Sequence, residues 1–180
     1  MAMRRGFFLF IFGVALFTPC FSQNMLLLGS EFNVTKPEFW NVGIGFNLIV
    51  INEYFQNDVM MNFGRIRTKD ADVCEKDNFL FSLADKFYFS VNGAIAGFRA
   101  GVFAALGMYD IVDFPTVYDM FFNTGGFVGV ALFPRSLFSL TADISPGYAM
   151  AFRLSDGPYI NEAGFSLSLS FGLRFNFDKL

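Results

Sequence analysis

Large apolar residues alternate with small or polar residues along the last part of the chain. Between Gly164 and Phe177 every odd position is phenylalanine or leucine, whereas the even positions hold glycine, serine, arginine or asparagine. Successive side chains of a β-strand point to opposite faces, so this pattern predicts a strand with one strongly apolar face. About 9–11 tilted residues already cross the hydrocarbon core of a bilayer. The stretch is therefore typical of a transmembrane strand whose apolar face contacts lipid.

Seven earlier segments show the same alternation, in some places less regularly. The predicted strands are 25–34, 40–51, 58–67, two strands that meet at Asn92-Gly93 and run on to about residue 109, 120–133, 137–151 and the opening stretch 164–177. Together they predict an all-β fold, a transmembrane eight-stranded antiparallel up-and-down β-barrel. A soluble β-barrel and a helical membrane protein are the alternatives. Polar residues interrupt the apolar runs before they reach the roughly 20 residues that a spanning helix needs.

The connections between the predicted strands alternate in length and charge. Short connections are expected at 52–57, 92–93 and 134–136, and long charged connections at 68–78, 110–119 and 153–160. Outer-membrane barrels have short periplasmic turns and longer external loops. The pattern therefore places both chain termini on the periplasmic side. Cys74 falls in the first of the long connections, and its role is left open.

Two local signals predict details of the strand pairing. Asn92-Gly93 favours a two-residue type I′ turn, which would put Lys86 opposite Arg99 on the neighbouring strand. Pro146 lies within a predicted strand, although proline cannot donate a hydrogen bond to a β-ladder. We therefore expect a β-bulge at residues 145–147.

The N-terminal residues predict an export signal. Arg4 and Arg5 precede an apolar run that ends at Phe17, and small residues follow it. We expect residues 1–22 to be removed as a signal peptide and residues 23–180 to form one barrel domain. A lipidated cysteine and an uncleaved anchor helix are the alternatives, and a proline in the segment disfavours both.

Composition narrows the classes of function. The chain is 54% apolar and only 16% charged, and it contains 28 phenylalanines, which suits a lipid-facing surface. Residues 23–180 would carry a net charge of about −5 and have no basic patch, so no nucleic-acid partner is expected. One cysteine in that range excludes an intramolecular disulfide and makes a thiolate metal site remote. No metal or other cofactor is predicted.

Four charged residues point to the inside of the predicted barrel by their position in the alternation. They are Lys86, Arg99, Asp143 and Arg174. The interior of an eight-stranded barrel is just wide enough to be filled by side chains, so we expect these residues to form an ion-pair plug. Asp143 is the expected counter-ion, assisted by Asp85 if a bulge turns it inward. A constriction for anionic solutes is the alternative interpretation.

The segment 170–177 resembles the C-terminal assembly signal of bacterial outer-membrane β-barrels. Gly172, Phe175 and Phe177 occupy the glycine position and the two aromatic positions of that signal, and three further residues follow here. The resemblance implies insertion in the bacterial outer membrane, with its lipids and the barrel-assembly machinery as partners. The chain looks like a small barrel of the OmpX, OmpW or OmpA-membrane-domain kind.

The resemblance also bears on activity. The enzymes among outer-membrane barrels resemble one another in using a catalytic histidine, and this chain contains no histidine. We therefore assign no catalytic residue and expect a non-enzymatic protein. An OmpX-like barrel implies a structural or surface-binding role, through external loops that contact an extracellular ligand. The alternative is an OmpW-like channel for small hydrophobic or anionic solutes.

Overall fold

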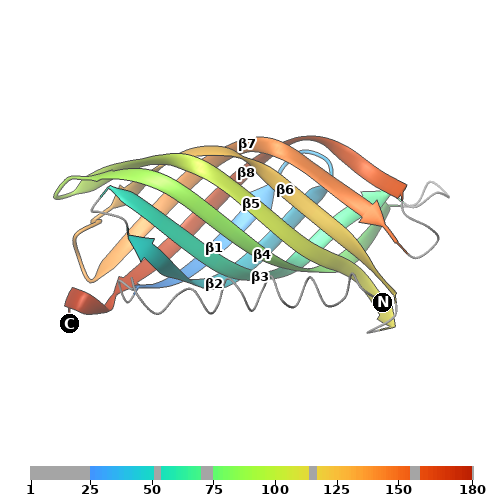
Figure 1. Ribbon diagram of the computed structural model, residues 1–180, viewed down its shortest axis with the longest axis horizontal. Helices are drawn as coiled ribbons and strands as arrows, with labels where there is room; N and C mark the ends of the chain where they lie inside the picture. Colours follow the sequence, from blue (N-terminus) through green and yellow to red (C-terminus); the bar gives the residue numbers. More distant parts are fainter. Residues whose placement is uncertain (1–24, 51–53, 70–74, 114–116, 155–158, 180) are drawn as a thin grey trace.

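Eight antiparallel strands close into one barrel in the computed structural model (Figure 1). The structure describes residues 25–50, 54–69, 75–113, 117–154 and 159–179. The strands are β1 (Met25–Asn33), β2 (Glu38–Val50), β3 (Phe55–Lys69), β4 (Glu75–Asn92), β5 (Ala96–Asp113), β6 (Val117–Leu132), β7 (Phe138–Arg153) and β8 (Tyr159–Asn176), followed by the 3₁₀ helix η1 (Phe177–Lys179). Each strand pairs with the next and β8 pairs with β1, so the sheet has no free edge. The predicted all-β, eight-stranded up-and-down architecture is confirmed.

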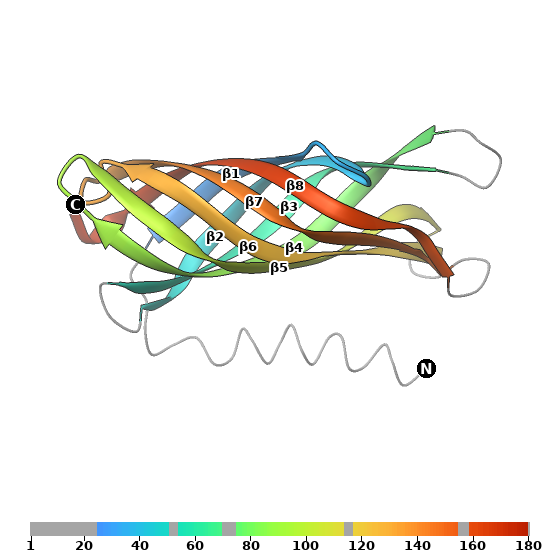
Figure 2. The same cartoon turned by 90° about the horizontal axis from the view of Figure 1, so that it is seen from above.

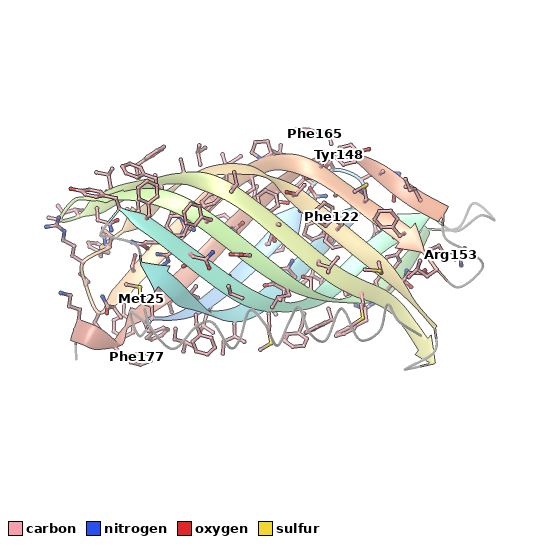
Figure 3. All side chains as sticks on the ribbon, viewed as in Figure 1. Met25, Phe122, Tyr148, Arg153, Phe165 and Phe177 are labelled. Atoms are coloured by element: carbon pink, nitrogen blue, oxygen red, sulfur yellow. The ribbon has the colours of Figure 1, made fainter. Side chains whose placement is uncertain are left out.

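Apolar side chains cover the outside of the barrel, and polar side chains dominate the inside. On β2, Trp40 and Phe46 are 46% and 53% exposed, whereas Asn41 between them is 3% exposed. Tyr148 and Phe165, which pair across β7 and β8, lie on the outer surface (Figure 3). Within the described residues no helix has the length and apolar character to cross a membrane. The barrel satisfies its backbone within the closed sheet and presents an apolar surface, as a bilayer requires.

The strands run further into the charged segments than the alternation predicts. β3 and β4 extend over most of the predicted loop 68–78, β5 and β6 over most of 110–119, and β7 and β8 reach the ends of 153–160. Arg67 Nε lies 3.1 Å from Asp77 Oδ1 in the paired strand, so charged residues pair across these extensions. The predicted loop boundaries were wrong because beyond the bilayer both faces of a strand can contact water, and the alternation disappears there.

The connection between β4 and β5 is longer than the Asn92-Gly93 dipeptide predicts. Val91 pairs with Phe98, four residues beyond its expected partner. Every strand in a closed barrel is held by ladders on both sides, and these outweigh a local turn preference. A change of the strand register by an even number of residues keeps each side chain on the same face of the sheet. Lys86 therefore still points inward, but the predicted opposition of Lys86 and Arg99 is wrong.

Residues 145–147 do not form the predicted bulge. β7 keeps one register with β8 through Pro146, which lies opposite Leu167. On the β6 side the register is the same at Ile144 and Gly147, and pairs are lacking only between these two residues. The missing N–H of the proline thus causes a gap in one ladder and does not require an extra residue.

Candidate functional site

Charged side chains from five strands meet inside the barrel. They are Asp58 of β3, Lys86 of β4, Arg99 of β5, Asp143 of β7 and Arg174 of β8, which together we call the charged layer. The structure thus brings together the four residues that the alternation places in the lumen. Sequence reasoning missed Asp58, although it shares its parity along β3 with the inward-facing Asn62.

Asp143 is the centre of one half of the charged layer. Arg99 donates hydrogen bonds from two nitrogens to its carboxylate, and the Nε to Oδ1 distance is 2.6 Å. Lys86 Nζ lies 3.1 Å from Asp143 Oδ2 and also donates to Ser170 Oγ at 3.1 Å. The Asp143 side chain is fully buried, and those of Arg99 and Lys86 are only 6% and 13% exposed. Paired, hydrogen-bonded ions of this kind can exist inside a protein, whereas isolated ones cannot.

Asp58 is the centre of the other half. Arg174 Nη2 contacts Asp58 Oδ2, and the single hydroxyl hydrogen of Tyr88 is shared between Gln56 Oε1 at 2.8 Å and Asp58 Oδ1 at 3.2 Å. The two halves join where Arg99 Nη1 lies 3.9 Å from Asp58 Oδ2. Asp143 was expected to be the common counter-ion of the cluster. The direct partner of Arg174 is instead Asp58.

Asp85 is not part of the charged layer, so its expected role as a second counter-ion is wrong. β4 runs through this position without a bulge and is in register with both of its neighbours. The side chain therefore points to the outer surface, where Asn57 Nδ2 donates to Asp85 Oδ1 at 2.7 Å.

Three inward aromatic rings, those of Tyr88, Phe103 and Phe127, pack against the charged layer. Lys86 Nζ lies 5.2 Å from the centroid of the Phe127 ring, and Arg99 Cζ lies 5.5 Å from that of Tyr88. Ring faces attract cations at these distances and exclude water from them. The cavity bordered by all five charged residues has a volume of only about 40 Å³.

A second group of buried side chains fills the lumen nearer the long connections. This apolar layer consists of Phe39, Ile66, Leu80, Tyr109, Phe121, Ala149 and Ala151. Phe39 and Phe121 meet edge to face with ring centroids 5.0 Å apart. Ile66 and Leu80 are fully buried. Sequence reasoning did not identify this layer.

The serines between the two layers do not form a catalytic arrangement. Ser166 donates to Asn123 Oδ1 at 2.9 Å, and both side chains are buried in the lumen wall. Ser170 accepts from Lys86, but an ammonium group that is ion-paired with Asp143 is not free to take a proton from a hydroxyl. Among the described residues there is no group of three or more side chains that could hold a metal ion.

The residues of the C-terminal signal occupy three different environments. Gly172 faces the lumen, where a Cβ atom would lie 2.6 Å from Thr141 Oγ1. Phe175 packs on Phe138 with ring centroids 4.9 Å apart, and Phe177 begins η1 and is 45% exposed. The predicted signal peptide (residues 1–22) and Cys74 lie outside the described residues.

Comparison with known proteins identifies the fold through structures alone. No protein-family model matches the sequence, and no curated protein matches it. The crystal structure of Neisserial surface protein A superposes with a TM-score of 0.58 at 13% identity, covering 87% of this chain and 98% of that one. The N-terminal β-barrel domain of Pseudomonas aeruginosa OprF has a TM-score of 0.46 at 14% identity, over 85% of this chain and 98% of that domain. Ail of Yersinia pestis has a TM-score of 0.40 at 13% identity, over 84% and 99%.

Three observations indicate the same fold: the closed barrel, its apolar outer surface and the likeness to Neisserial surface protein A. The chain has the fold of a small bacterial outer-membrane β-barrel.

Proposed function

We propose that this protein is a non-enzymatic outer-membrane barrel with a side-chain-filled lumen, which acts as a structural or surface-interaction protein through its external connections. The observation that carries the proposal is the closure of the bore by two successive layers, one charged and one apolar. A barrel that conducts no solute exerts its effect through the surfaces that it exposes.

The dimensions of the lumen support this proposal. The cavity beside the charged layer holds about 40 Å³, and a second one nearer the chain termini, between Arg99 and Asn176, holds about 30 Å³. About 10–15 Å³ of such cavity volume accommodates one water molecule, so each space holds only a few waters. A hydrated ion would have to displace the Arg99–Asp143 pair to pass.

The external ends of the strands support a role at the cell surface. β4 and β5 are 18 residues long, although about 9–11 tilted residues cross a bilayer core. The paired ends of β3 and β4, of β5 and β6, and of β7 and β8 lie at the end of the barrel opposite the C-terminus (Figure 2). Binding residues are concentrated on loops that a rigid scaffold holds in place, so we expect any extracellular ligand to bind there.

Conductance measurements test the proposal. Purified protein in planar bilayers should show no steady conductance, and liposomes that contain it should not swell in small anionic or apolar solutes. A known open porin measured in the same membranes is the positive control. Steady, reproducible conductance would instead support the alternative, a channel for small hydrophobic or anionic solutes.

We also propose that Gly172, Phe175 and Phe177 serve as the signal read by the barrel-assembly machinery. Phe177→Asp should reduce the folded fraction in the outer membrane, measured as the species whose gel migration changes on boiling. Lys179→Asp, an exposed change two residues further on in η1, is the matched control and should assemble normally. Normal assembly of Phe177→Asp, or equal loss in both variants, would contradict the assignment.

A further inference from the structure

An acidic side chain lies in the middle of the lipid-facing surface of β4. The outward positions of this strand from Phe79 to Val91 are apolar with one exception, which is Asp85. Asp85 is six residues from each end of this series. With a rise of about 3.3 Å per residue and a tilt of about 45°, roughly 14 Å of apolar surface extends on either side of it.

This position is unfavourable for an acidic group unless it has partners. Ionisable side chains that face lipid at the bilayer midplane are costly and rare. Among the described residues, the hydrogen bond that Asp85 accepts is the one from Asn57 Nδ2 at 2.7 Å, and no lysine or arginine forms an ion pair with it. The hydrocarbon core itself supplies no hydrogen-bond partner. A second protein chain at this depth would supply the further polar partners that an ionised Asp85 requires.

The surface on the far side of Asp85 is made of small residues. Asp85 pairs with Ala104 of β5, which pairs with Thr124 of β6, and Val102 beside them pairs with Gly126. A Cβ atom on Gly126 would meet no atom closer than 3.5 Å, so the outer surface has free space above this glycine. Small residues let the backbones of two membrane proteins approach closely, which strengthens hydrogen bonds between them.

We propose that this surface, formed by Asn57, Asp85, Ala104 and Thr124, is the contact between two copies of the chain. All copies insert in the same orientation, so a twofold axis normal to the membrane places the polar groups of both copies at one depth. The Asn57 residue is only 8% exposed, but its amide nitrogen already reaches the exposed Asp85 carboxylate. In this arrangement its second amide hydrogen donates to Asp85 of the other copy. The pair is self-complementary, because each copy supplies both a donor and an acceptor.

Energy transfer between labelled copies tests the proposal. Cys74 is the one cysteine in residues 23–180, so donor and acceptor dyes can be placed there without further substitution. In lipid vesicles of fixed composition, transfer should rise with the protein-to-lipid ratio, saturate, and fall when unlabelled protein is added. Asp85→Leu and Asn57→Leu should each weaken association by about tenfold, since both remove the polar contacts between copies.

The controls separate association from folding. Phe171→Leu changes an exposed outer residue on β8 and should leave association unchanged. Asp85→Leu removes a polar group from the apolar belt, so it should fold, which heat-dependent gel migration checks. Random-level transfer for the wild type, or equal association of wild type and Asp85→Leu, would overturn the proposal. A wild type that is monomeric in pure lipid but cross-links to a different protein in native membranes would overturn it in favour of an unlike partner.

Discussion

The charged layer and the apolar layer close the same bore in different ways. In the charged layer, Asp143 and Asp58 hold arginine and lysine side chains that reach them from other strands, and each ion depends on a specific partner. In the apolar layer, rings such as Phe39 and Phe121 fill space by shape alone. Removing one member therefore has different consequences. The first layer is left with an unpaired buried ion, and the second with a void.

This difference implies that the two layers contribute differently to stability. Desolvation offsets most of the attraction within a buried ion pair, so the charged layer adds less net stability than its contacts suggest. The apolar layer consists almost entirely of hydrocarbon side chains, so it loses little to desolvation. A shift of one strand by an odd number of residues would turn its charged side chain away from the lumen and leave the partner ion unpaired.

The largest expected effect is that of Asp143→Ala. This change leaves Lys86 and Arg99 without their principal counter-ion while Arg174 remains on Asp58. We expect a loss of about 3–5 kcal/mol in the free energy of unfolding. Denaturant unfolding in lipid vesicles, followed by the fluorescence of the single tryptophan, Trp40, measures it.

A compensated variant distinguishes lost pairing from lost volume. The triple variant Lys86→Met, Arg99→Met and Asp143→Leu replaces Asp143 and its two partners with apolar residues. It should recover most of the stability, because Asp58 and Arg174 still pair and no buried ion is left unpaired. A fully stable Asp143→Ala barrel that conducts anions would contradict the plug and favour a transport function.

The sequence predicted the architecture and much of the charged layer because charges stand out against an alternating pattern. Lys86, Arg99 and Asp143 are polar residues at inward positions of otherwise regular strands. Asp58 was overlooked because it stood at the predicted start of its strand. At such a position the alternation does not distinguish a polar turn residue from a polar residue that faces the lumen. The structure shows that the strand begins earlier, at Phe55.

The apolar layer could not be predicted in the same way. The run Phe79, Leu80 and Phe81 is apolar on both faces, and alternation assigns a face only when the two faces differ. Leu80 is fully buried, whereas Phe79 is 54% exposed to the surroundings of the barrel. The pairing of β4 with β5, which brings Leu80 beside the buried Tyr109, shows which of these residues fill the lumen.

A smaller effect is expected when shape is exchanged within the apolar layer. Ile66→Leu keeps the volume of a fully buried residue, so the free energy of unfolding should fall by less than about 1.5 kcal/mol. The same unfolding assay measures it. A loss as large as that of Asp143→Ala would show that the apolar layer needs one specific fit, and would remove the contrast between the layers.

The smallest effect is expected at the external ends of the strands, where the same ionic chemistry is exposed to water. Arg67 Nη1 lies 3.3 Å from Glu38 Oε2 and Arg67 Nε lies 3.1 Å from Asp77 Oδ1, but all three side chains are nearly half exposed. Exposed ion pairs contribute about 0–1 kcal/mol and weaken as salt is added. Arg67→Ala should therefore change the free energy of unfolding by less than about 1 kcal/mol in the vesicle assay, with a smaller change at high salt. Arg67→Lys is the control that keeps the charge. A loss approaching that of Asp143→Ala would show that depth in the barrel does not determine how much an ion pair contributes to the free energy of unfolding.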